Sequence, residues 1–176
     1  MIDFSRNHFE LFGLPSRFRF DPAFLDRAYH ELQGAVHPDR FAAAGAAEQR
    51  MALQASARVN EAYRALKDPV ARAQYLLSLQ GIEAFSETDT SLAIDFLERQ
   101  LERREQAGDA AAAGDGRSLA ALLAAVRAES AELEQRVAAL LDAEAAWDVA
   151  RQRVRELKFL QKFAADIDAM LAQLDD

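Results

Sequence analysis

The chain has 176 residues, is 51% hydrophobic and contains no cysteine, so it is long enough to bury a core, and disulfides, cysteine nucleophiles and thiolate metal sites are excluded. Alanine and leucine are abundant and β-branched residues are scarce, which predicts an all-α protein. The formal net charge of -8 comes entirely from residues 84–176, which carry 19 acidic and 11 basic side chains. The excess negative charge of this half predicts no nucleic-acid or membrane partner and favours a partner with a basic surface. An acidic helical face is, however, also common as ordinary solvated surface.

The N-terminal residues show neither a signal peptide nor an apolar run of membrane-spanning length, which predicts a cytoplasmic protein. An apolar cluster at Phe9–Leu14 ends at Pro15 and predicts a short helical docking segment. The next helix begins where Asp21 supplies an N-cap and Pro22 occupies the first helical position. Apolar residues then recur at three- and four-residue spacing as far as Val36, which predicts an amphipathic helix.

The tripeptide His37-Pro38-Asp39 follows this helix and predicts its end, because a residue before proline is disfavoured in the α region. The resulting turn displays an imidazole and a carboxylate. Asp39 is suited to accept a bidentate pair of hydrogen bonds from an arginine on a partner. Pro-Asp is also common turn chemistry, so the tripeptide alone leaves a binding role and a purely structural role open.

A second long helix is predicted after the small-residue loop at 42–46, packed antiparallel to the first with His37-Pro38-Asp39 at their junction. Asp68-Pro69 repeats the signal of a cap followed by proline and predicts a further helix that ends at Gly81, which we interpret as the domain boundary. The predicted core face of the second long helix consists of Leu53, Ser56, Val59, Ala62, Tyr63 and Leu66.

Three more helices are predicted in the acidic half of the chain. The polar stretch at 86–90 provides the cap of the first, which is expected to break at 108–116, with Ala110–Ala113 as a connector. Two long amphipathic helices complete the chain, one through Leu119–Leu141 and one through Trp147–Leu174. We therefore expect a C-terminal three-helix bundle.

The first helix of this bundle has more apolar surface than burial requires. On a helical wheel of residues 92–106 the apolar side chains cover roughly 200°, whereas a buried stripe needs roughly 100°. The excess predicts a protein-binding edge, while the alternative is that every leucine is buried in the bundle. The edge consists of the apolar residues Leu101 and Ile94 bordered by Glu98, Glu102 and Glu105.

Three segments, in this order and spacing, together resemble the J-domain co-chaperones. Residues 71–79 and the acidic helical half are similar to one subgroup, the HscB proteins of iron-sulfur cluster assembly, so the resemblance spans nearly the whole chain. It implies a J-domain at 1–80 built on an antiparallel helix pair with short flanking helices, a linker at 81–90 and a three-helix scaffold-binding domain at 91–176. The three segments are Phe9–Leu14, His37–Phe41 and Asn60–Pro69.

The resemblance implies a co-chaperone and not an enzyme, without a cofactor or metal of its own. Such a protein stimulates the ATPase of an HscA-like chaperone and delivers an IscU-like scaffold protein to it. The implied chaperone-binding residues are His37, Pro38, Asp39, Arg27 and Arg40, and the implied scaffold-binding residues are Leu97, Leu101, Glu102, Glu105 and Phe159.

Two positions depart from the family pattern, and one observation supports the scaffold site independently. Arg27 is the only lysine or arginine on its helix, which predicts weak charge steering toward the chaperone, and an exposed helix residue without a role is an equal alternative. Glu98 stands where the pattern has an apolar residue, which predicts a smaller or more acidic patch. Phe159 falls outside the core register of the last helix.

Alternatives remain open in other functional classes. A general J-protein and a passive helical adaptor without ATPase stimulation both fit long amphipathic helices, although Trp147 and Phe163 drift from a strict heptad. An enzyme is disfavoured because the three histidines form no metal or nucleophile motif with the carboxylates. The glycines at 108–116 follow no strand and lack the lysine of a phosphate loop.

Overall fold

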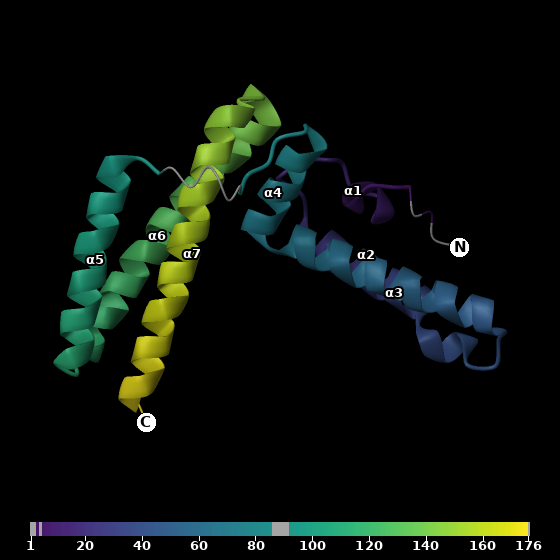
Figure 1. Cartoon of the computed structure of the whole chain (residues 1–176), viewed down its shortest axis with the longest axis horizontal. Coiled ribbons are helices and arrows are strands. Elements are labelled where there is room, and N and C mark those ends of the chain that lie inside the picture. The colour runs from purple at the N-terminus through teal and green to yellow at the C-terminus, as the bar shows by residue number, and fades with distance from the viewer. Residues whose placement is uncertain (1–2, 4, 86–91, 176) are drawn as a thin grey trace. The chain divides into compact units, whose positions relative to one another are not determined.

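The computed structural model describes residues 3, 5–85 and 92–175, and the chain divides into two compact units, Met1–Leu76 and Leu77–Asp176. Every regular element among the described residues is helical (Figure 1). The predicted all-α fold is therefore confirmed. The predicted cap at 86–90 lies outside the described residues.

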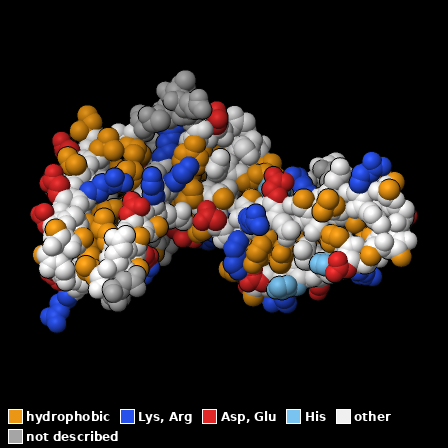
Figure 2. Space-filling model, turned by 60° about the horizontal axis from the view of Figure 1, so that its bottom comes forward, with side chains coloured by type: hydrophobic (Ala, Val, Ile, Leu, Met, Phe, Trp, Pro, Cys, Tyr) orange, Lys and Arg blue, Asp and Glu red, His pale blue; other side chains and the backbone are white. Residues whose placement is uncertain are grey.

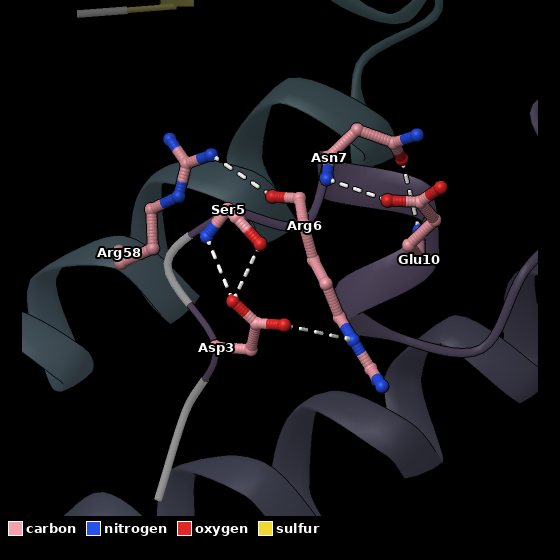
Figure 3. Close-up of polar contacts among 6 residues, drawn as sticks. All are labelled: Asp3, Ser5, Arg6, Asn7, Glu10 and Arg58. Atoms are coloured by element: carbon pink, nitrogen blue, oxygen red, sulfur yellow. Dashed lines mark hydrogen bonds and ion pairs between the residues drawn. The ribbon is translucent and has the colours of Figure 1, made fainter.

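The first unit begins with α1 (His8–Leu11), a helix of one turn that depends on its cap. The side chain of Asn7 accepts a hydrogen bond from the Glu10 amide, and the Glu10 carboxylate accepts one from the Asn7 amide, each at 2.9 Å (Figure 3). This capping box pairs two amides that a helix start leaves unsatisfied. Arg58 donates to the carbonyl of Arg6 at 3.3 Å and so ties the segment before α1 to the long helix that carries Arg58.

That long helix, α3 (Ala46–Lys67), lies alongside α2 (Pro22–Val36), which Asp21 caps as predicted (Figure 1). The predicted core position Leu53 is wrong, because its side chain is 62% exposed. The buried stripe begins one residue earlier, at Ala52, and small residues in it let the two helices approach closely. Sequence reasoning favoured the larger leucine over the alanine beside it. The buried residues of α3 are Ala52, Ala55, Ser56, Val59, Ala62 and Leu66.

The fourth helix, α4 (Pro69–Leu79), begins at the predicted cap, where the Asp68 carboxylate accepts a hydrogen bond from the Ala71 amide at 2.7 Å. Its buried Arg72 places a guanidinium 4.4 Å from the ring centroid of Phe18 and 4.8 Å from that of Phe20. Cation–π contacts of this kind stabilise a charge withdrawn from water.

His8 is a buried histidine whose environment disfavours its charged form. Its ring stacks on that of Tyr75 with the centroids 4.0 Å apart, and its amide donates to the Tyr75 hydroxyl at 3.0 Å. Burial lowers the pKa of His8 below its ordinary value of 6.5, and the positive charge of Arg58 lowers it further, against a smaller opposite effect of Glu61.

We expect the first unit to lose stability as the pH falls below 6.5, because the unfolded chain then takes up a proton that folded His8 resists. All three tyrosines and all three histidines precede residue 77, and the single tryptophan follows it. Near-ultraviolet tyrosine dichroism during heating therefore reports the first unit, and Trp147 fluorescence reports the second. Between pH 7.5 and 5.5, the thermal transition followed by tyrosine dichroism is expected to shift less in His8→Phe than in the wild type, while the transition followed by Trp147 fluorescence shifts equally in both. An equal shift of the tyrosine transition in both proteins would contradict this prediction.

The second unit contains the predicted three-helix bundle: α5 (Ile94–Ala112), α6 (Gly116–Ala139) and α7 (Trp147–Asp175), which lie side by side in Figure 1. The polar side chain of Gln100 on α5 is 1% exposed, and neither its amide nitrogen nor its amide oxygen has a hydrogen-bond partner among the described residues. The buried core is formed by Phe96, Ala107, Leu119, Leu123, Val126, Leu160, Phe163 and Ile167.

The predicted break at 108–116 is confirmed only in its last part, because α5 continues through Gly108 to Ala112 and α6 begins at Gly116. The predicted connector at Ala110–Ala113 is wrong, since most of it is helical. A glycine inside a helix costs about 1 kcal/mol relative to alanine. Here the packing of Ala107, Ala110 and Ala111 against the core offsets that cost. The chain turns instead at Gly114, whose φ of 68° suits glycine.

The connection between α6 and α7 is a tight turn. One π-helical turn, Leu140–Glu144, extends α6, and Ala145 then adopts a left-handed φ of 49° before α7 begins. Glu144 forms an ion pair with Arg136 across this turn. Further along α7, buried Arg155 donates to the carbonyl of Ala84 at 2.7 Å and so ties Ala84 to this helix.

Candidate functional site

The tripeptide His37-Pro38-Asp39 lies at the predicted end of α2. His37 is the C-cap residue with φ -59° and ψ 129°, the extended conformation that a following proline imposes. The chain then forms a single 3₁₀ turn, Pro38–Phe41, in place of an irregular loop. The Arg40 amide donates to the carbonyl of His37 at 3.1 Å, which closes the turn.

The two polar side chains of this turn face each other at its surface. Nδ1 of His37 accepts a hydrogen bond from the Asp39 amide at 3.4 Å and lies 3.5 Å from Oδ2 of Asp39. Both contacts involve Nδ1, so Nε2 of the ring is available to a partner. The side chain of Asp39 is 90% exposed and that of His37 49% exposed, so the turn presents an acceptor and a donor to a partner.

Two side chains fix the loop around this turn. Arg40 donates to the carbonyl of Gly34 at 3.1 Å and so satisfies one of the free carbonyls at the end of α2. Gln49, in the first turns of α3, donates to the carbonyls of Ala42 and Ala44, each at 3.1 Å. Sequence reasoning missed Gln49. The feature that could have predicted this role is a long side chain with an amide donor, placed just after a loop of small residues that cannot pair their own carbonyls.

A polar clamp also holds α2 against α3 along their length. The Asp26 carboxylate accepts hydrogen bonds from Lys67 at 2.6 and 2.8 Å and from the Tyr63 hydroxyl at 2.9 Å. These bonds, that from Lys67 foremost, lower the pKa of Asp26. Tyr29 stacks on Tyr63 with the ring centroids 4.0 Å apart and donates to Asn60 at 2.9 Å. The clamp therefore fixes the direction from which α2 enters the turn.

Arg27 stands apart from the other predicted chaperone-binding residues. It lies ten residues before His37 on α2, which is roughly 15 Å along a helix. Its guanidinium pairs with Asp21 at 3.7 Å and lies 5.9 Å from the ring centroid of Phe24. The structure thus brings His37, Asp39 and Arg40 together and leaves Arg27 separate.

On α5, three apolar side chains remain exposed at i, i+3 and i+7: Ile94 at 74%, Leu97 at 43% and Leu101 at 61%. Three exposed glutamates, Glu98, Glu102 and Glu105, border them. Along the edge of the molecule that α5 forms, Figure 2 shows hydrophobic side chains beside acidic ones. The predicted surplus of apolar surface is confirmed, since the bundle does not bury these leucines.

Phe159 lies at the border between this edge and the core. It is half-buried on α7, and its ring meets that of Phe96 edge to face with the centroids 5.7 Å apart. Arg104 of α5 lies 5.1 Å from the centroid of the Phe159 ring and 3.9 Å from the Asp166 carboxylate. We call Ile94, Leu97, Leu101 and Phe159, with the glutamates beside them, the acidic-apolar edge. The predicted site residues omitted Ile94 and Arg104.

Among the described residues, no group of three or more histidine and carboxylate side chains is placed to hold a metal ion. No helix in the described part of the chain is long and apolar enough to cross a membrane. What the structure displays is surface chemistry: a donor-acceptor turn on one unit and an apolar edge bordered by carboxylates on the other. Both suit binding to other proteins.

Comparisons with known proteins place both units in one group. Residues 93–168 match the family model described as the HSCB C-terminal oligomerisation domain. The chain is 45% identical over 175 residues to the co-chaperone protein HscB homolog of Burkholderia multivorans, covering 99% of each chain. It is 45% identical to that of Paraburkholderia phymatum over 100% of each.

Solved structures show the same likeness. Chaperone HscB from Vibrio cholerae matches with a TM-score of 0.87 at 38% identity, over 96% of this chain and 99% of that one. The human co-chaperone protein HscB matches with a TM-score of 0.89 at 27% identity, over 96% of this chain and 83% of that one.

Proposed function

This chain belongs to the HscB family, the co-chaperones of iron-sulfur cluster assembly, and on that premise we propose that it stimulates the ATPase of an HscA-like chaperone and delivers an IscU-like scaffold protein to it. The proposal assigns chaperone contact to the J-domain at 1–80 and scaffold contact to the bundle at 91–176, joined through 81–90. It places both events in the cytoplasm.

The observation that carries the chaperone contact is the exposed pair His37 and Asp39 on a turn that is fixed on both sides. Arg40 and Gln49 hold the surrounding loop through carbonyl groups, so little conformational entropy remains to be lost on binding. An exposed carboxylate on a fixed turn is a good acceptor for a partner arginine. Neither side chain has to transfer a proton for this role, which is consistent with a protein that regulates an ATPase and performs no chemistry itself.

The acidic-apolar edge supports the scaffold contact. Leu97, Leu101 and Phe159 supply an apolar centre, while Glu102 and Glu105 supply a charged rim that selects a basic partner surface. Glu98 makes the rim more acidic on the side where the family pattern has an apolar residue. Ile94 adds apolar area one turn before Leu97 and offsets that change.

Single-turnover ATP hydrolysis by an HscA-like chaperone, measured with and without this protein and with and without an IscU-like scaffold, tests the proposal. We expect this protein to accelerate hydrolysis and the scaffold to increase the effect. A general J-protein would stimulate without responding to the scaffold. A passive helical adaptor would bind the scaffold without stimulating hydrolysis, and that result would refute the chaperone role.

A further inference from the structure

The second unit contains two lysines, Lys158 and Lys162, which are exposed and lie one turn apart on α7. Neither forms a hydrogen bond or ion pair with the described residues, although this half of the chain carries a surplus of carboxylates. Like charges four residues apart on a helix repel each other, so the pair slightly destabilises α7. An exposed lysine is ordinary on a protein surface, and it is the position of this pair beside the acidic-apolar edge that gives it significance.

The arginines of the bundle differ from these lysines, because many of them are paired with carboxylates. Asp166, one turn after Lys162, pairs with Arg104 of α5 at 3.9 Å. Lys158 has only an aromatic contact among the described residues, with its Nζ 3.9 Å from the centroid of the Phe85 ring. A ring attracts an ammonium group but does not neutralise its charge. Both lysine charges are therefore left for a partner. The arginines of the bundle that form ion pairs are Arg99, Arg103, Arg104, Arg127, Arg136 and Arg153.

The two lysines lie on the solvent side of Phe159. Successive residues of an α-helix are rotated by about 100°, so Lys162 and Lys158 lie about 60° and about 100° from Phe159 in one direction. The core residues Phe163 and Leu160 lie about 40° and about 100° from it in the other direction. Around α7, the buried core is thus followed by half-buried Phe159 and then by the lysines, which we call the basic strip.

The glutamates of α5 lie on the far side of the same surface. Arg104, whose guanidinium is 5.1 Å from the centroid of the Phe159 ring, marks the side of α5 that faces α7. Measured from Arg104 on the helical wheel, Leu97 lies at about 20° and Leu101 at about 60°. Glu105 follows at about 100°, farther from α7. A path across the surface therefore runs from the basic strip over apolar side chains to carboxylates.

We propose that the basic strip is a second charged border of the acidic-apolar edge and that it binds an acidic patch on the IscU-like scaffold. The inference rests on the proposed function and specifies the surface of the scaffold: basic opposite the α5 glutamates, apolar in the centre and acidic opposite Lys158 and Lys162. Two borders of opposite sign fix the direction in which the scaffold lies across the edge. A scaffold turned end for end would meet like charges on both sides.

Isothermal titration calorimetry of an IscU-like scaffold with charge-reversed variants tests the inference through the sign of the effect. Lys158→Glu with Lys162→Glu is expected to weaken binding about tenfold at low salt and by less at high salt, because salt screens exposed charges. Glu102→Lys with Glu105→Lys is expected to weaken binding as well. The two variants change the net charge in opposite directions, so a scaffold with a single sign of charge on its surface would not lose affinity for both.

Arg99→Glu with Arg117→Glu is the matched control, because it changes the net charge as the lysine variant does. Arg99 lies on the side of α5 opposite to Leu97, and Arg117 lies at the start of α6. The affinity of this control should stay near that of the wild type. All variants should keep the thermal transition that Trp147 fluorescence reports, since the substituted side chains are exposed.

Three results for the lysine variant would overturn the inference and leave the proposed function intact. An unchanged affinity would show that the lysines are only solvated surface. A tighter affinity would show that the scaffold is basic throughout. A loss equal to that of the control would show an effect of net charge alone. A wild-type protein that does not bind the scaffold would overturn the proposed function, and the inference with it.

Discussion

Replacing His37 by glutamine is expected to reduce stimulation of the chaperone ATPase about tenfold or more at saturating concentrations of this protein. The imidazole is half exposed, and among the described residues its side-chain hydrogen bond and ion pair are both with Asp39 of the same turn, so the substitution removes a partner contact without opening a cavity. Pro38 still ends α2, and Arg40 and Gln49 still hold the loop. The measurement is single-turnover hydrolysis of ATP.

Asp39→Asn is the companion variant, because it keeps an acceptor oxygen but removes the charge that favours a bidentate arginine. It should lose stimulation to a similar degree. Far-ultraviolet dichroism and the thermal transition should match the wild type for both variants, since the two side chains are exposed. Full stimulation by His37→Gln would show that the tripeptide is only a structural turn.

Leu97→Ala combined with Leu101→Ala is expected to weaken binding of an IscU-like scaffold about a hundredfold, while the thermal transition of the bundle stays near that of the wild type. A loss of about 1.4 kcal/mol per leucine, which is within the range that interface side chains commonly contribute, corresponds to a factor of ten for each. The free protein loses little, because water already covers much of both side chains. Isothermal titration calorimetry measures the affinity, and Trp147 fluorescence follows unfolding of the same unit.

Phe163→Ala is the contrasting variant on the inner side of the bundle, where the ring is 1% exposed. Its removal should cost about 3–5 kcal/mol of the free energy of unfolding. A comparable loss from the double leucine variant would show that Leu97 and Leu101 belong to the core. An unchanged affinity with unchanged stability would remove the scaffold role from this edge.

Local signals predicted much of this architecture. Asp21 followed by Pro22 and Asp68 followed by Pro69 start helices, and His37 before Pro38 ends one, because each depends on backbone geometry within a few residues. The surplus of apolar surface on α5 could also be predicted, because the regular geometry of a helix fixes which side chains share a face.

Tertiary packing decided the features that the sequence did not reveal. Leu53 and Ala52 are neighbours, and only the close approach of α2 determines which of them is buried. Gly108 stays helical because residues around it pack against the bundle core. The role of Gln49 depends on loop carbonyls that come within its reach only once the chain has turned between α2 and α3.

The sparse burial along α5 affects how the acidic-apolar edge behaves in solution. This helix buries only Phe96, Gln100 and Ala107, and the amide of Gln100 has no partner among the described residues, whereas α6 buries five apolar side chains. Local opening requires least free energy where few apolar contacts are lost. Amide hydrogens of α5 should therefore exchange with solvent sooner than those of α6, and a bound client would slow that exchange. Under the proposed function, the helix that binds the client is therefore also the helix whose local opening the client suppresses.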